Sequence, residues 1–155
     1  MPGYFVDTSA LAKLFHPENG SERLEALAKE PGSRLIISQL SLVEIQSVFA
    51  TKVRAGVIDR LAFNQLQGLF FAELAQGRFE VVLLARRHLA AAEVLVRTHS
   101  VDRGLRTLDA VQLSVALDLK RRGAASHLVA SDKNLCAVAA IEGLGILDPT
   151  EQGSG

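Results

Sequence analysis

Short apolar runs alternate with longer helical patterns along the whole chain, and this alternation limits the fold more than any other feature. The runs 35–37 and 81–84 contain no polar residue. Strands that are apolar on both faces are typical of parallel sheets covered by helices on both sides. We therefore predict an α/β fold with three α/β/α layers, built on a parallel sheet of four to five strands with helices on both faces.

The boundaries of these elements follow from apolar periodicity and from helix start and stop signals. The expected strands cover 4–6, 34–37, 79–84, 127–130 and 146–147. The expected helices cover 8–15, 21–29, 38–54, 60–75, 86–98, 108–121 and 132–141. Asp59 and Thr107 are the predicted N-caps of two of them, and 100–106 is predicted to be a polar link. We expect one domain over residues 1–150 and a flexible tail over 151–155.

Composition and charge exclude several classes of protein. The seventeen basic and seventeen acidic residues cancel, so any site for a polyanion must be local. A single cysteine, Cys136, excludes an internal disulfide framework and suits a reducing compartment. No apolar run is long enough to span a bilayer, and the N-terminus lacks the pattern of a signal peptide. We expect a cytoplasmic protein that does not bind a membrane.

Two acidic residues directly follow predicted strands. Asp7 comes after the apolar run 4–6, and Asp132 follows the run 127–130 through Ser131. Each also precedes a helical pattern, so each is either a helix N-cap or part of a site. Because parallel strands bring their carboxyl ends to the same edge of a sheet, we expect the two acids to lie at that edge, where ligands bind.

Two more acids interrupt apolar helix faces. Glu44 lies one turn from Leu40 and from Val48, and Asp109 lies in a similar apolar stripe near the start of the helix 108–121. A buried carboxylate is costly unless it is paired or bound to a metal. The alternatives are that Glu44 turns outward or forms a capping box with Ser41, and that Asp109 only stabilises a helix N-terminus.

If the four acids converge, their mutual repulsion either raises their pKa values or requires a cation. A set of carboxylate oxygens suits Mg²⁺ or Mn²⁺. The four histidines show no paired metal spacing, and the chain has no glycine-rich phosphate loop.

Four segments carry these acids in order: 6–11 (VDTSAL), 38–44 (SQLSLVE), 105–113 (LRTLDAVQL) and 130–135 (ASDKNL). Together they resemble the four acidic motifs of PIN-domain ribonucleases, and the resemblance covers nearly the whole chain. The short single-domain length is most similar to the VapC toxins of VapBC toxin–antitoxin pairs.

The resemblance implies a role for particular residues. The implied catalytic residues and ligands of Mg²⁺ or Mn²⁺ are Asp7, Glu44, Asp109 and Asp132. The implied supporting polar residues are Thr8, Ser9 and Ser131. Among the basic residues near the acids, Lys13 and Arg106 are predicted to contact substrate phosphates.

The implied activity is that of a metal-dependent endoribonuclease, which cleaves RNA phosphodiester bonds with a metal-activated water as the toxin of a type II toxin–antitoxin system. A small antitoxin protein and a homodimer are the implied partners. The adjacent residues Phe70 and Phe71 cannot both face one core, so either one of them serves an interface or the helix has a broad buried face. The alternatives are a stand-alone PIN nuclease in RNA processing and a catalytically silent PIN module that binds RNA or protein.

Two other classes also place an acid after the first strand. A haloacid-dehalogenase-type phosphatase needs a second acid two residues later, where this chain has Ser9. A receiver domain needs an acid after a middle strand, and the run 79–84 is followed by Ala85 and Arg86. Neither class fits the sequence.

Overall fold

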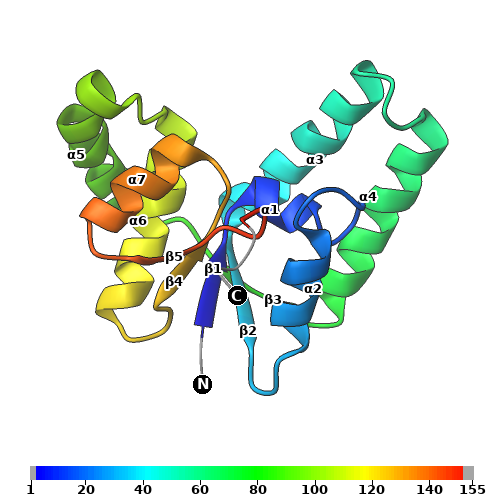
Figure 1. Cartoon of the computed structure of the whole chain (residues 1–155), viewed down its shortest axis with the longest axis horizontal. Coiled ribbons are helices and arrows are strands. Elements are labelled where there is room, and N and C mark those ends of the chain that lie inside the picture. The colour runs from blue at the N-terminus through cyan, green and yellow to red at the C-terminus, as the bar shows by residue number, and fades with distance from the viewer. Residues whose placement is uncertain (1–2, 152–155) are drawn as a thin grey trace.

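Five parallel strands form the centre of the structure, a computed structural model that describes residues 3–151 (Figure 1). They are β1 (Gly3–Val6), β2 (Arg34–Ser38), β3 (Phe79–Val82), β4 (His127–Val129) and β5 (Gly145–Leu147). The strand order is β3-β2-β1-β4-β5, and every neighbouring pair is parallel. This confirms the predicted parallel sheet. The predicted flexible tail, apart from Glu151, lies outside the described residues.

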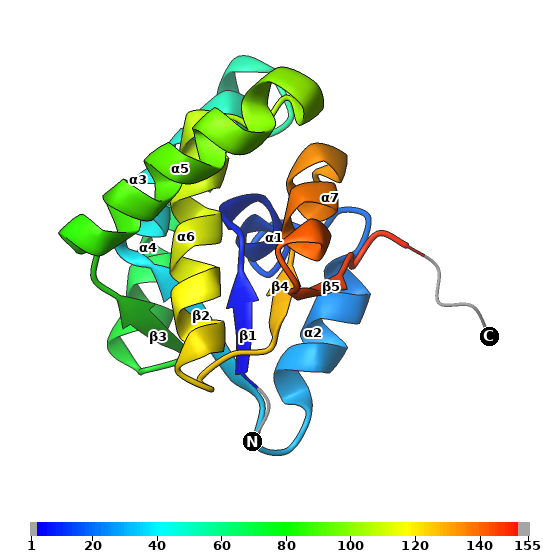
Figure 2. The same ribbon diagram turned by 90° about the vertical axis from the view of Figure 1, so that its left-hand side faces the viewer.

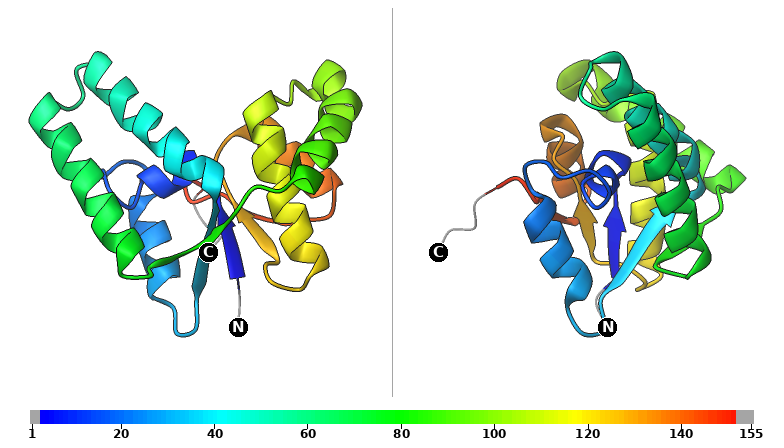
Figure 3. Two further views of the ribbon diagram at one scale, coloured as in Figure 1. Left: turned by 180° about the vertical axis from the view of Figure 1, so that it is seen from behind. Right: turned by 90° about the vertical axis from the view of Figure 1, so that its right-hand side faces the viewer.

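Seven helices in the described part of the chain cover the two faces of the sheet (Figures 2 and 3). They are α1 (Thr8–Ala12), α2 (Ser21–Lys29), α3 (Gln39–Arg54), α4 (Arg60–Ala75), α5 (Arg86–Arg103), α6 (Thr107–Arg121) and α7 (Lys133–Ile141). Helices α1 to α4 lie on one face, and α5 to α7 lie on the other, which gives the predicted three layers. Within residues 3–151, no helix has the length and apolar character needed to cross a membrane.

The alternation of side chains along the strands separates two apolar cores. Phe5 and Leu128 point into the core beneath α5, α6 and α7. Val6 and Ile37 point into the core beneath α1 to α4. The second core contains a cluster of aromatic rings whose centroids lie 5.5 to 6.4 Å apart, formed by Phe15, Phe49, Phe70 and Phe79. Both faces of the central strands β1, β2 and β4 are therefore covered by helices.

The strand order reverses direction beside β1, which makes this position the topological switch point of the sheet. The chain leaves β1 for β2 and β3 on one side and later returns to β4 and β5 on the other. Val6 pairs with Val129, and the backbone N–H of Asp7 donates to the carbonyl oxygen of Val129 at 3.0 Å. In open α/β sheets ligands bind beyond the carboxyl ends of the strands at such a switch point. The residues after β1 and β4 therefore occupy the expected position of a site.

Two predicted features around α5 and α6 are wrong. Residues 100–103 belong to α5 rather than to a polar link, and Gly104 ends the helix in a left-handed conformation with a φ of 64°. Polar residues propagate a helix adequately, and a glycine in this conformation is a common helix terminator. The N-cap position of α6 is Arg106, so Thr107 is already helical. The predicted cap Asp59 is confirmed by its bond from the N–H of Ala62.

The edge strand β3 is shorter than predicted. It ends at Val82, whereas the apolar run continues to Leu84, and the side chain of Leu83 is 69% exposed. Within residues 3–151, β3 pairs only with β2, so no second described strand holds the end of the run in the sheet. The N–H of Leu84 instead donates to Oε1 of Gln39 at 3.1 Å.

The adjacent residues Phe70 and Phe71 on α4 provide a matched test of the second core. Phe70 is completely buried, whereas Phe71 is 50% exposed. We expect Phe70→Ala to lower the free energy of unfolding by about 3–5 kcal/mol, because it leaves a cavity among the aromatic rings. We expect Phe71→Ala to lower it by less than about 1 kcal/mol. Urea unfolding of both variants measures the difference, and equal losses would contradict this packing.

Candidate active site

Asp7 lies between the end of β1 and the start of α1. It occupies the N-cap position of α1, but in the described structure its side chain makes no capping hydrogen bond. The residue is 6% exposed. Sequence patterns left two interpretations of Asp7, a helix N-cap or part of a site. A side-chain capping bond therefore does not explain why this carboxylate is buried.

The surroundings of Asp7 disfavour its charged form. Burial has the largest effect, and the negative charges of Asp109 and Glu44 add to it, so the pKa of Asp7 rises from 3.8 to about 7. The backbone N–H groups of Thr8 and Ser9 oppose this rise without cancelling it. Asp7 therefore exchanges a proton near neutral pH unless a cation lies beside it.

Glu44 reaches the same place from α3, where it is half-buried. Its Oε1 accepts hydrogen bonds from Oγ1 of Thr8 at 2.8 Å and from Nε2 of Gln112 at 2.7 Å. The capping-box alternative does not hold, because the N-cap of α3 is Ser38 and the hydroxyl of Ser41 bonds to Thr8 and Gln112 instead. Glu44 therefore points inward and is held by neutral donors.

Asp109 and Asp132 both contact the guanidinium of Arg106. Nε of Arg106 lies 3.2 Å from Oδ2 of Asp109, and its Nη2 lies 3.4 Å from Oδ2 of Asp132. Burial raises the pKa of Asp109, Arg106 opposes the rise, and the charge of Asp132 adds to it. Asp132 also caps α7 by accepting from the N–H of Leu135 at 2.9 Å, so the capping interpretation holds for this residue.

A cavity of about 690 Å³ at the carboxyl edge of the sheet contains three of the four predicted acids. The predicted site residues in its lining are Asp7, Thr8, Ser9, Glu44, Arg106 and Asp109. Asp132 is outside this lining and joins the group through Arg106. Leu40, Val43 and Leu108 give the cavity an apolar rim.

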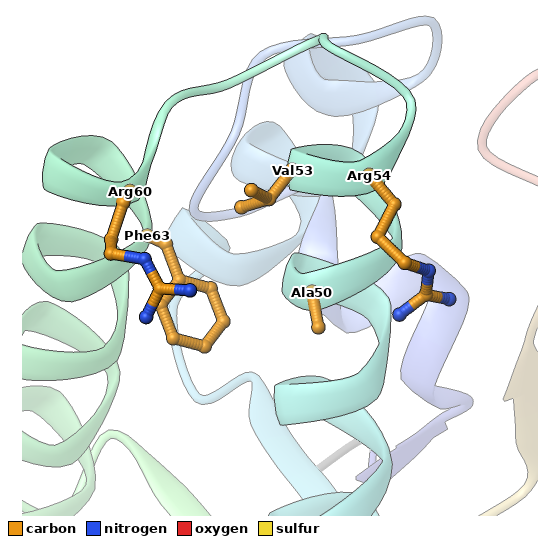
Figure 4. A pocket seen from close by; sticks show the side chains of 5 residues that line it. All are labelled: Ala50, Val53, Arg54, Arg60 and Phe63. Atoms are coloured by element: carbon orange, nitrogen blue, oxygen red, sulfur yellow. The ribbon is translucent and has the colours of Figure 1, made fainter.

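A second pocket, between α3 and α4, provides a contrast (Figure 4). Its volume is about 260 Å³. The side chains that line it come from Ala50, Val53, Arg54, Arg60 and Phe63. None of these residues is an acid, so the larger acidic cavity is the candidate active site.

Two of the remaining predicted site residues, Lys13 and Ser131, are not among the residues that line the cavity. Lys13 donates to Glu18 at 3.1 Å, and Glu18 also accepts from Lys52 at 2.8 Å. Lys52 lines the acidic cavity, but sequence patterns gave no reason to select it. The hydroxyl oxygen of Ser131 is buried without a hydrogen-bond partner among the described residues.

The donor chemistry at this edge fits a hard divalent cation. The carboxylates of the four predicted acids lie there together with the hydroxyl side chains of Thr8 and Ser9, and oxygen donors of this kind are the ligands that Mg²⁺ and Mn²⁺ prefer. The pKa of Asp7 is raised by neighbouring negative charge, and an added cation would relieve that repulsion. Among residues 3–151, however, no three acidic, histidine or cysteine side chains are drawn together tightly enough to form a closed metal site.

Sequence patterns gave no role to Gln112. It is completely buried on α6, one turn after Asp109, and it contacts Glu44. Its position between the apolar residues Val111 and Leu113 is the signal that could have identified it.

A sequence model of the family described as the PIN domain matches residues 4–141 of the chain. No curated protein sequence matches the chain well enough to be counted as a relative. Solved structures with the same fold include VapBC2 from Rickettsia felis bound to a promoter DNA fragment, at 20% identity and a TM-score of 0.61, over 94% of this chain and 97% of that one.

Two further structures share the fold. VapC20 from Mycobacterium tuberculosis, described as a toxin that cleaves the sarcin–ricin loop, is 20% identical with a TM-score of 0.62, over 91% of this chain and 95% of that one. FitAcB from Neisseria gonorrhoeae is 13% identical with a TM-score of 0.61, over 94% and 97% of the two chains. At these identities the likeness establishes the three-layer fold.

The raised pKa of Asp7 predicts how stability depends on pH in a chelator. Between about pH 4 and pH 7 the folded protein keeps a proton that the unfolded chain has lost, so stability falls as the pH rises through this window. We expect Asp7→Asn to match the wild type near pH 4 and to be more stable at pH 8, by at most about 4 kcal/mol. Urea unfolding at several pH values measures this.

Asp102→Asn serves as the control for this experiment, because Asp102 is exposed on α5. Its stability should follow that of the wild type at every pH. A difference between Asp7→Asn and the wild type that does not change with pH would contradict the raised pKa.

Proposed function

The chain belongs to the PIN-domain family, and from this membership and its acidic edge we propose that it is a divalent-metal-dependent endoribonuclease. The observation that carries the proposal is the cavity into which Asp7, Glu44 and Asp109 all extend. A site that gathers negative charge repels RNA unless a cation joins it. The proposed cation is Mg²⁺ or Mn²⁺, and its proposed ligands are these three acids together with Asp132.

A divalent metal bound there would lower the pKa of a water molecule and would neutralise phosphate oxygens as charge develops on them. The protein side chains prepare the site for this chemistry. The hydroxyl of Thr8 donates to Glu44 and so keeps that carboxylate turned into the cavity. Arg106 lies at the mouth with a 73% exposed side chain, where its guanidinium can contact a phosphate of the substrate.

We further propose that the protein acts as the toxin of a type II toxin–antitoxin system. Support comes from the fold shared with VapBC2, VapC20 and FitAcB over more than nine-tenths of this chain. In this proposal a small antitoxin protein is the partner, and the toxin works in the cytoplasm as a homodimer. The exposed side chain of Phe71 on α4 is available for one of these interfaces.

Purified protein should cleave RNA in Mg²⁺ or Mn²⁺ and stop when EDTA is added. Asp7→Asn and Asp109→Asn should each reduce the cleavage rate at least about 100-fold, because each removes a carboxylate from the cavity. Gel analysis of labelled RNA measures the rate, and Asp102→Asn on exposed α5 should cleave like the wild type. Undiminished cleavage by Asp7→Asn would sink the proposed mechanism.

Expression of the wild-type protein in a bacterial host should arrest growth, whereas Asp109→Asn should not. Co-expression of a small DNA-binding protein encoded directly upstream should restore growth. Growth curves and plating efficiency measure both effects. An active nuclease that leaves growth unchanged would reject the toxin role and leave a stand-alone RNA-processing nuclease.

A further inference from the structure

Gln112 is a completely buried polar side chain at the acidic edge of the sheet, and it belongs to none of the groups discussed so far as metal ligands. It lies on α6, one turn after Asp109. Its amide nitrogen Nε2 lies 2.7 Å from Oε1 of Glu44, 3.0 Å from Oγ of Ser41 and 3.1 Å from Oγ1 of Thr8. The amide group has two hydrogens for these three contacts, and the shortest contact is the one to the carboxylate, as is usual for a charged acceptor.

The orientation of the Gln112 amide is set by a fourth contact. The hydroxyl of Ser38 donates to Oε1 of Gln112 at 2.7 Å. This bond fixes the carbonyl end of the amide, so Nε2 must face Glu44, which can only accept. An amide turned the other way would place two acceptors against each other, and burying them unpaired is costly.

The contacts of Gln112 join elements that are distant in sequence. Ser38 ends β2, Ser41 and Glu44 lie on α3, and Thr8 begins α1 directly after Asp7. Through this network the helix that carries Asp109 is linked to the helix that carries Glu44. Both hydrogen bonds to Glu44 end on Oε1, so among the described contacts Oε2 is the oxygen left to face the cavity.

We propose that Gln112 is a positioning residue that holds the carboxylate of Glu44 in place for a divalent cation. The inference rests on the proposed function, because it assigns a purpose to the orientation of a proposed ligand. Partners of this kind in the outer shell of a metal site typically change metal affinity by about 10- to 100-fold when they are removed. Gln112 does not itself contact the cation.

The test uses Gln112→Met, which keeps the length of the side chain and removes both polar ends. The variant is titrated with Mn²⁺ alone, and binding is measured by calorimetry and by the electron paramagnetic resonance signal of free Mn²⁺. Its affinity for Mn²⁺ should be about 10- to 100-fold lower than that of the wild type. Ser114→Ala is the matched control. Ser114 is also buried on α6, where its hydroxyl donates to the carbonyl oxygen of Val111, so its loss should leave Mn²⁺ affinity unchanged.

Ser38→Ala supplies a milder variant in case Gln112→Met does not fold. It removes only the bond that orients the amide, and we expect Mn²⁺ affinity to fall about fivefold. Thermal unfolding in EDTA shows which variants are folded. A lower melting temperature with unchanged Mn²⁺ affinity in the folded variants would mean that the network is only structural, and this result would overturn the inference.

The outcomes separate this inference from the proposed function. If the wild type binds Mn²⁺ but cleaves no RNA, the nuclease proposal fails, and the ratio of affinities still decides the role of Gln112. If the wild type cleaves RNA and Gln112→Met binds Mn²⁺ equally well, only the inference fails. A wild type that does not bind Mn²⁺ would overturn both.

Discussion

A carboxylate buried beside two other carboxylates is the constraint on which the active edge depends. Strand β1 is paired on both sides, and the N–H of Asp7 is bonded to β4, so the residue after β1 cannot move out to solvent. Its charged form is disfavoured first by burial and then by Asp109 and Glu44. Protonation or a cation must offset that cost, because an isolated buried charge is not tolerated. The same sheet pairing that stabilises the fold therefore keeps Asp7 where a proton or a cation must offset its charge.

The surrounding side chains neutralise some of the acids and not others. On the outer side, Arg106 contacts both Asp109 and Asp132. On the inner side, Thr8 and Gln112 orient Glu44 but are neutral, so they add no positive charge next to Asp7. Neutral donors hold the direction of a carboxylate without reducing its ability to bind a cation as much as a salt bridge would. Asp7 and Glu44 are consequently the acids at which a bound cation would relieve the most repulsion.

The sequence predicted those features that depend on local pattern. Apolar runs separated by helical patterns indicated the parallel sheet, and the position of Asp7 and Asp132 after strands indicated a shared edge, because both inferences use short-range periodicity. The role of Gln112 was missed since its partners Ser41 and Glu44 lie 71 and 68 residues away, and only the folded chain brings them together. The length of α5 was missed because its end depends on the conformation of Gly104.

Arg106 connects the charge of the site to its proposed substrate. Its side chain is 73% exposed, so the guanidinium can turn from Asp109 and Asp132 toward solvent. A metal cation bound by the acids would weaken their attraction for the guanidinium of Arg106. A substrate phosphate at the mouth of the cavity would attract the same guanidinium outward. In the proposed nuclease one side chain therefore balances the acids before the cation arrives and contacts the RNA backbone afterwards, and this exchange follows from its exposure and from the two carboxylates it spans.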